Sequence, residues 1–404
     1  MRYWKTILII LLAVYALPVL SYIVFGTLDS NGAKDFHQFW YAGHFILRGQ
    51  DPYQAFFAEE NLPVRQPGLE ITPSNSPLLL LVLSMFSILA WPAAKIVWLL
   101  LNLFLACLSF WLIVEKLPFP NASLDRQTKI LLFLLYFDLS PTRIAIENGQ
   151  TTLLVLALML AAILLAERSW LLAGLFLGLA LSKYSVSLSV ALFFLFHRDF
   201  RVLVTALLSQ FLGFVGLSII SGNSVSLVFA EYYYLFISLM NQRGIHLSTL
   251  IPGTRLDVII SVIMTLALAL CIYFWLMRKR TYQLVDSRIL DFHLLTIFML
   301  WSLVVAYHRL YDALLLLLLM TLVFKAMIHA DIWGLSLRMR AVVAWGLGIG
   351  LALLTIPARI VGFFLPGMYG LLTNEIPAMI LLVFLSALMF LFHRFLFPPV
   401  LYTS

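Results

Sequence analysis

Long apolar runs, separated by short polar stretches, fill the sequence from one end to the other. About 20 apolar residues are enough for a helix to cross a bilayer. The runs predict an all-helical membrane protein with about twelve spans, at about 6–25, 95–114, 130–141, 150–166, 169–182, 184–197, 202–221, 256–277, 290–306, 309–327, 341–363 and 376–393. The shortest of them require tilting, burial by neighbouring helices or local thinning of the bilayer.

Basic residues predict how these spans are oriented. Lys and Arg concentrate in cytoplasmic loops, and the basic groups at 198–201, 278–280 and 325–340 all fall between apolar runs. The runs alternate consistently only if 77–92, bounded by Pro77 and Pro92, does not cross the membrane. That run therefore predicts a re-entrant or interfacial helix, and both termini are expected in the cytoplasm.

Composition narrows the class of protein. Hydrophobic residues make up 63% of the chain and charged residues 11%, whereas a soluble domain has about 25% charged residues. This excludes a soluble enzyme and a disordered chain. The net charge of +7 is accounted for by cytoplasmic loops, so no nucleic-acid partner is expected, and Cys107 and Cys271 lie within apolar runs and indicate no disulfide framework.

The long outer loop 26–76 contains the first candidate chemistry. Residues 36–48 have apolar and polar faces at helical spacing, which predicts an amphipathic helix on the membrane surface. Its polar face carries His37, Tyr41, His44 and Arg48, and we expect the first three to contact the substrate.

Asp35 directly precedes this helix. It fits an N-cap, and it also fits a general base, and the two roles are compatible because a cap fixes where the carboxylate points. Asp29 is the alternative acid, although it lies closer to the end of the first span.

Other polar residues fall at predicted outer corners of the bundle. Lys183 lies alone between two apolar runs and either snorkels to the surface or binds a phosphate. Ionisable groups at membrane depth usually mark function, so we expect substrate contacts at these corners from Arg143, Glu147, Gln150 and Lys183. In or near the loop 222–255, which also carries Glu231 and Arg243, we expect them from His246 and Arg255.

The densest polar cluster is the stretch 307–312, which contains Tyr307, His308, Arg309, Tyr311 and Asp312 between apolar flanks. One interpretation is an interfacial ion pair of Arg309 and Asp312 at helical spacing. The other is a functional site, with His308 as a catalytic group and Arg309 and Asp312 as substrate contacts.

Some patterns in the sequence do not indicate a catalytic or metal-binding site. Gly174 and Gly178 form a GxxxG pair, which predicts close helix packing. His37 and His44 are about 10 Å apart along a helix, too far to share one metal ion. No metal or cofactor is predicted. Asp35, Asp51 and Glu147 could meet around a divalent ion, but their spacing gives no positive evidence for one.

The predicted site suits a lipid-linked phosphorylated substrate. It combines a carboxylate on an outer helix with cations and histidines, and the residues between them are apolar and aromatic. The lipid tail would lie among the helices and the phosphate against Lys or Arg. The carboxylate would act as general base on an acceptor hydroxyl, and a phosphate leaving group needs its charge stabilised. These features predict a single-displacement glycosyl transfer with inversion.

Several short motifs resemble glycosyltransferase family 87, a branch of the GT-C membrane glycosyltransferases. In chain order they are Asp35-Phe36, Tyr41-Ala42-Gly43, Gly49 to Tyr53, Ser76-Pro77, Ala90 to Trp98, Gly149-Gln150-Thr151, Ala173 to Gly178, Lys183 and Arg198, followed by the sparser match Tyr307-His308-Arg309. Two stretches depart from the family pattern, namely Ser74 to Pro77 and the pair Lys183-Tyr184.

The resemblance implies a polyprenyl-phosphate-sugar donor, often of mannose, used at the outer face of the cytoplasmic membrane on a lipid or glycan acceptor. It implies that Asp35 is the catalytic aspartate and that His308 is functional. It divides the chain into a catalytic module, 1–201, and a more variable helical module, 202–404. A flippase for a lipid-linked sugar and another lipid-carrier enzyme, such as a polymer ligase, are the alternatives. The sugar, linkage and oligomeric state are left open.

Overall fold

The computed structural model describes most of the chain in detail. The described residues are 2–29, 32–66, 68–69, 71–117, 123–240, 245, 287–305, 308–328, 337–356, 361, 364–365 and 367–396, with scattered positions between 259 and 273. The predicted span 256–277 therefore falls largely outside them.

All regular structure in these residues is helical. The first half of the chain forms α1 (Arg2–Leu28), α2 (Lys34–Ile46), α3 (Pro52–Phe57), α4 (Pro77–Leu83), η1 (Ser84–Ile88), α5 (Trp91–Trp111), η2 (Leu112–Lys116), α6 (Arg126–Asp138), α7 (Ser140–Glu147), α8 (Thr152–Leu165), α9 (Trp170–Ala180), η3 (Leu181–Lys183) and α10 (Tyr184–His197). The second half forms α11 (Phe200–Ser221), α12 (Val225–Met240), α15 (Ser287–Val305), η4 (Leu310–Leu315), α16 (Leu316–Ile328), α17 (Leu337–Thr355), α19 (Met368–Gly370), η6 (Leu371–Glu375) and α20 (Ile376–Leu396).

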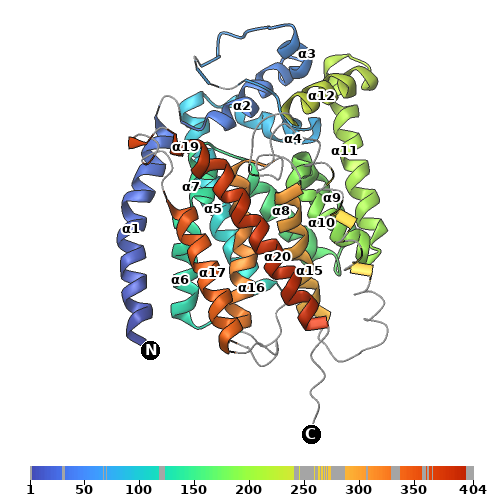
Figure 1. Cartoon of the computed structure of the whole chain (residues 1–404). Helices are drawn as coiled ribbons and strands as arrows, with labels where there is room; N and C mark the ends of the chain where they lie inside the picture. The colour runs from blue at the N-terminus through green and yellow to red at the C-terminus, as the bar shows by residue number, and fades with distance from the viewer. Residues whose placement is uncertain are drawn as a thin grey trace.

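The long helices lie side by side in a bundle (Figure 1). Within the described residues, five helical stretches are long and apolar enough to span, and a sixth is added if the bent pair α7 and α8 is one broken span; the five are Lys5–Leu28, Trp91–Lys116, Trp170–His197, Phe200–Ser221 and Met368–Met389. The protein is thus an all-helical, multi-pass membrane protein, as the apolar runs predicted. The number twelve stays a prediction.

The stretch Trp170–His197 is a hairpin in three dimensions. A Cβ on Gly174 would lie 2.4 Å from Cβ of Thr205, and one on Gly178 would lie 1.8 Å from Oγ of Ser209. These pairs show that α9 and α11 pack closely and run in the same direction, so α10 must return toward the start of α9. The GxxxG prediction of close packing is confirmed, and Lys183 lies at the tip of the hairpin.

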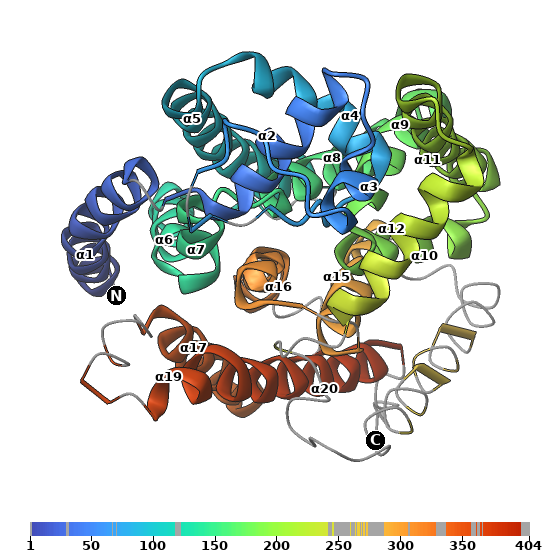
Figure 2. The same cartoon turned by 90° about the horizontal axis from the view of Figure 1, so that it is seen from above.

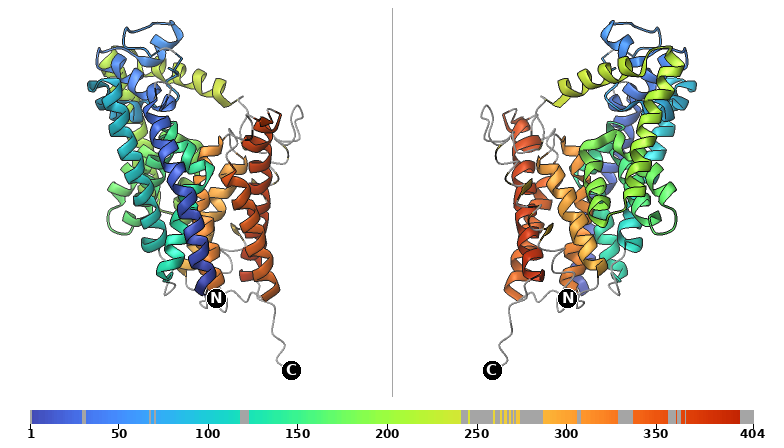
Figure 3. Two further views of the ribbon diagram at one scale, coloured as in Figure 1. Left: turned by 90° about the vertical axis from the view of Figure 1, so that its left-hand side faces the viewer. Right: turned by 90° about the vertical axis from the view of Figure 1, so that its right-hand side faces the viewer.

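The end of the bundle opposite the start of α1 and the end of α20 is covered by short helices (Figure 1). There α2, α3 and α4 lie above α5 and α8, and α12 crosses the top of the bundle (Figure 3). The helices α4 and η1 contain seven and five residues, too few to cross a bilayer. They expose Met85 and Ile88, as expected of the interfacial helix predicted at 77–92.

The helix predicted at 36–48 exists as α2, but its surroundings differ from the prediction. Much of both faces is buried: His37 and Tyr41 on the polar face are as enclosed as Phe36 and Phe39 on the apolar one, while His44 is half-buried. The reason is that the chain after α3 folds back over the polar face, where Leu62 N donates to Tyr41 Oη at 2.8 Å. The location of this helix on the membrane surface stays a prediction.

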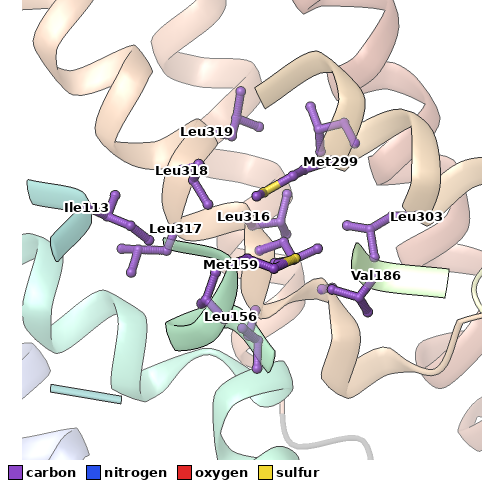
Figure 4. Packing of buried hydrophobic residues seen from close by; sticks show 14 of the residues in the cluster. Ile113, Leu156, Met159, Val186, Met299, Leu303, Leu316, Leu317, Leu318 and Leu319 are labelled. Carbon is purple, nitrogen blue, oxygen red and sulfur yellow. The ribbon is translucent and has the colours of Figure 1, made fainter. Parts of the chain in front are cut away.

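The larger apolar core is organised around α16, which lies between the first helices of the chain and the layer formed by α17 and α20 (Figure 2). Leu316, Leu317 and Leu318 are fully buried there, beside Met159 of α8 and Met299 of α15 (Figure 4). Burial on all sides of a helix is expected where it is the innermost of a bundle. This core holds η4, which begins α16, in a fixed place at the top of the bundle.

Candidate active site

Asp35 is held where α2 meets the corner between α7 and α8. Ala33 N donates to Glu147 O at 3.1 Å, and Asp35 N donates to Asn148 O at 3.0 Å. Ala33 is the N-cap residue, in a left-handed conformation with φ 53°, and Asp35 lies in the first turn. The N-cap interpretation of Asp35 is thus wrong, because main-chain carbonyls already satisfy the helix's first N–H groups. Its carboxylate is left for other contacts.

The Asp35 side chain is buried, with 6% of its surface exposed, and its carboxylate accepts a short hydrogen bond from Gln150 Nε2. Burial raises the pKa of Asp35 above the ordinary 3.8, while Gln150 and the charges of Lys34, Arg309 and Lys183 act to lower it. Because desolvation is the largest of these effects, burial makes the carboxylate a stronger base than a free aspartate. Asp29, the alternative acid, is exposed at the end of α1.

The corner that receives α2 depends on Gly149. The helices α7 and α8 meet there at 110°, and Gly149 has φ 68°. A Cβ at this position would lie 2.7 Å from Cβ of Phe36. The ring of Phe36 stacks on Trp98 with centroids 4.5 Å apart, and Trp98 Nε1 donates to Gly149 O at 2.8 Å. The position of Asp35 is thus fixed by packing on both sides.

Lys183 turns inward from its hairpin tip. Its Nζ donates to Asp312 Oδ1 at 2.5 Å and makes a short hydrogen bond to Thr152 Oγ1, which in turn donates to Asp312 Oδ1 at 2.8 Å. The Lys183 side chain is 15% exposed, and its ammonium lies 4.6 Å from the ring centroid of Tyr311. Snorkelling to the surface is therefore the wrong interpretation of Lys183, because a buried carboxylate draws it into the protein.

Asp312 also fixes the orientation of His308. His308 Nδ1 lies 3.1 Å from Asp312 Oδ2, and Arg309 N donates to the same oxygen at 3.3 Å. Since an ionised carboxylate only accepts hydrogen bonds, Nδ1 carries the proton. His308 is fully buried, and its Nε2 has no hydrogen-bond partner among the described residues. This nitrogen is the atom that His308 can offer to a substrate.

Other residues of α2 contact the outer loop. His37 Nε2 accepts a hydrogen bond from Gln66 N at 3.4 Å, just as Tyr41 accepts one from Leu62. His44 packs edge-on against Trp40, with centroids 4.5 Å apart, and burial together with Arg48 lowers the pKa of His44. In the described contacts, these side chains organise the loop around α2.

Arg143 connects three helices through its described hydrogen bonds. It donates to Tyr15 Oη at 3.0 Å, to Ser140 Oγ at 2.6 Å and to Thr355 O at 2.9 Å. It therefore joins α7 to α1 and to the end of α17. Glu147 is buried beside Gly26, and its carbonyl helps to hold α2. Two residues of the predicted set, His246 and Arg255, lie outside the described residues, as do Arg243 and Tyr307.

Sequence reasoning missed Thr152, which bridges Lys183 and Asp312. The available signal was a hydroxyl residue at the start of an apolar run, two residues after Gln150. It also missed the hydrogen bond of 2.7 Å between Ser76 Oγ and Ser182 Oγ, which ties the start of α4 to the Lys183 corner. Among the described residues, no three His, Cys, Asp or Glu side chains are grouped as metal ligands.

A buried acid, an oriented imidazole and the inward-turned Lys183 lie at one end of a bundle whose long apolar helices are suited to crossing a membrane. The family model of glycosyltransferase family 87 matches residues 74–285, which is just over half of the chain. The protein belongs to this family and is a membrane glycosyltransferase. A comparison with curated proteins and another with solved structures give no match. The family range includes Gln150 and Lys183, while Asp35 and His308 lie outside it.

Proposed function

We propose that the protein transfers a hexose, with mannose as the first candidate, from a polyprenyl-phosphate donor to a lipid or glycan acceptor. The observation that carries this proposal is a set of hydrogen bonds on one short segment: Gln150 donates to the buried Asp35 carboxylate, and Thr152, two residues further on, contacts both Lys183 and Asp312. A single displacement requires a general base and a cationic group that binds the phosphate, close to one another.

In the reaction, an acceptor hydroxyl oxygen attacks the anomeric carbon and its proton passes to Asp35. The bond between that carbon and the phosphate oxygen breaks, and the electron pair leaves with the polyprenyl phosphate. The configuration inverts because attack and departure take place on opposite faces. Burial supports this role of Asp35, since a raised pKa brings a carboxylate closer to the operating pH of a general base.

The leaving phosphate would lie against Lys183 and Arg309. An ammonium has three N–H donors, and described residues take two of those of Lys183, namely Thr152 and Asp312. The third is left for a phosphate oxygen. A cation fixed in advance stabilises the developing charge without reorganisation.

His308 would contact the transferred sugar, with Nε2 accepting a hydrogen bond from a hydroxyl group. Gln150 and Glu147 would line the same space, and Asp312 would act by positioning Lys183 and His308. The proposed site thus draws on both expected modules of the chain, 1–201 and 202–404.

The basic residues at the start of α1, Arg2 and Lys5, favour a cytoplasmic location for that end of the bundle. The site is at the opposite end. We therefore place the reaction at the extracytoplasmic face of the cytoplasmic membrane, where the lipid-linked donor would reach the site from the bilayer.

The test is Asp35→Asn in proteoliposomes supplied with radiolabelled polyprenyl-phosphate-mannose and a membrane glycolipid extract. Loss of a general base should slow transfer by about 10²- to 10⁴-fold. Asp199→Asn, which changes an exposed aspartate at the start of α11, should leave the rate unchanged. Near-normal transfer by Asp35→Asn would refute the assignment. Movement of label across the bilayer without a new glycosidic bond would instead favour a flippase.

A further inference from the structure

A pocket of about 450 Å³ lies between α2, α3 and the chain that follows α3. Aromatic side chains line it from two helices: Tyr41 and Phe45 from α2, and Phe56 and Phe57 from α3. The helix α3 lies at the far end of the molecule, beyond the ends of the long helices (Figure 1).

The pocket is close to the proposed base. Ala42, which lines it, follows Asp35 by seven residues on α2. Seven residues make almost two full turns, so both residues lie on nearly the same face of the helix, about 10 Å apart along its axis. A short chain of sugar rings can bridge such a distance.

A second connection runs from the pocket toward the donor side. Pro73 lines the pocket, the next residue, Ser74, donates to Gln38 Oε1 at 2.8 Å, and Ser76 contacts Ser182, next to Lys183. The segment 73–76 therefore runs along α2 from the pocket to the cations. Hydrogen bonds of this segment thus link a wall of the pocket to the corner that holds Lys183.

The charge of the pocket makes it a poor binding site for the donor's phosphate. Glu59 and Glu60 lie at its rim and are exposed, and the single cation of the lining, Arg65, donates to Asn61 Oδ1. Two carboxylates against one guanidinium disfavour an anionic group. A neutral ligand rich in hydroxyl groups fits better, because hydroxyls donate to carboxylates.

The aromatic walls supply the complementary feature. Ligand pockets combine apolar and aromatic walls with a few polar groups that fix orientation. The C–H face of a sugar ring packs on such walls while its hydroxyls reach the rim. Phe57 is 49% exposed, so one wall is open to an incoming ligand.

We propose that this pocket binds a neutral sugar ring of the acceptor, so that the acceptor is a glycan or a glycolipid that already carries sugar. This inference rests on the proposed function, since it assigns the second substrate of the same reaction.

The experiment measures binding of a panel of soluble trisaccharides, built from mannose, glucose, galactose or N-acetylglucosamine, to the purified full-length protein by saturation-transfer NMR. Wild-type protein should bind at least one of them, and Phe57→Ala and Glu60→Gln should each weaken binding at least tenfold. Both side chains are exposed, so these variants should fold. Glu167→Gln, an exposed change between α8 and α9, is the matched control and should bind as wild type does.

Failure of the whole panel to bind, or equal binding by wild type and both pocket variants, would overturn the proposal. Preferential binding of inorganic phosphate or glycerol phosphate at the pocket would do the same, because it would identify an anion site. Asp35→Asn should bind the trisaccharide normally, so the pocket can be tested even if the role of Asp35 in transfer is disproved.

Discussion

Replacing Gly149 with alanine tests whether the corner between α7 and α8 positions the catalytic base. An alanine at φ 68° costs about 1–2 kcal/mol for the left-handed backbone. Its Cβ would lie 2.7 Å from Cβ of Phe36, whereas carbon atoms pack at about 3.5–4.0 Å. Overpacking of this kind costs about 1–3 kcal/mol more, so we expect a total loss of about 2–5 kcal/mol.

The effect on activity should exceed the effect on folding. Phe36 adjoins Asp35, and the two residues must shift together by nearly 1 Å to clear the new methyl group. A misplacement of about 1 Å can cost about 10²-fold in rate. The assay compares transfer per folded molecule with the unfolding temperature in detergent, followed by tryptophan fluorescence.

Gly222 provides the matched control. It has a nearly equal φ of 72°, but a Cβ there would meet nothing within 4 Å. Gly222→Ala therefore carries the backbone cost alone and should transfer at the wild-type rate. Wild-type turnover by Gly149→Ala, or an equal loss in both variants, would refute the argument that contact with Phe36 places the base.

Three further predictions follow from the same contacts. Transfer should fall as the pH drops through the pKa of Asp35, which burial raises above 3.8, because only the ionised carboxylate accepts a proton. Gln150→Ala removes a hydrogen bond that lowers this pKa, so the acid limb of the rate profile should move to higher pH. An unmoved acid limb would argue against Asp35 as the titrating group. Asp312→Asn should lower kcat/KM by about 10- to 150-fold, since a hydrogen bond to a charged group contributes about 1.5–3 kcal/mol. Tighter donor binding in steady-state kinetics would mean instead that the negative charge of Asp312 weakens binding of the donor's phosphate. Arg143→Ala should lower the unfolding temperature by removing the bonds that join α7 to α1 and α17, while transfer per folded molecule stays unchanged; a selective loss of transfer would return Arg143 to the substrate site.

The elements of the fold were largely readable from the sequence because apolar length and basic loops depend on local composition. Pro77 and Pro92 correctly marked a segment that does not form a long helix. The environment of α2 was not readable. Its spacing of polar residues predicted an exposed face, but the chain after α3 returns to cover that face, and such a contact is not encoded in periodicity.

The candidate site was predicted as a set of residue types rather than as a network. Lys183 and Asp312 were both recognisable as costly residues next to apolar runs. Their pairing was not, because the sequence offered a nearby partner for Asp312 and no sign of a partner 129 residues away. Capping of α2 by the carbonyls of Glu147 and Asn148 was equally hidden, since main-chain groups leave no signature in side-chain type.

The ion pair between Lys183 and Asp312 has a consequence for biosynthesis. A ribosome adds about 5–20 residues per second, so the 129 residues between the two partners take roughly 6–26 s to synthesise. Throughout that interval the nascent chain carries an ammonium group that lacks its anion. Completion of the last third of the polypeptide therefore neutralises the cation and assembles the enzyme in one event, and a prematurely terminated chain would expose the charge to cellular quality control.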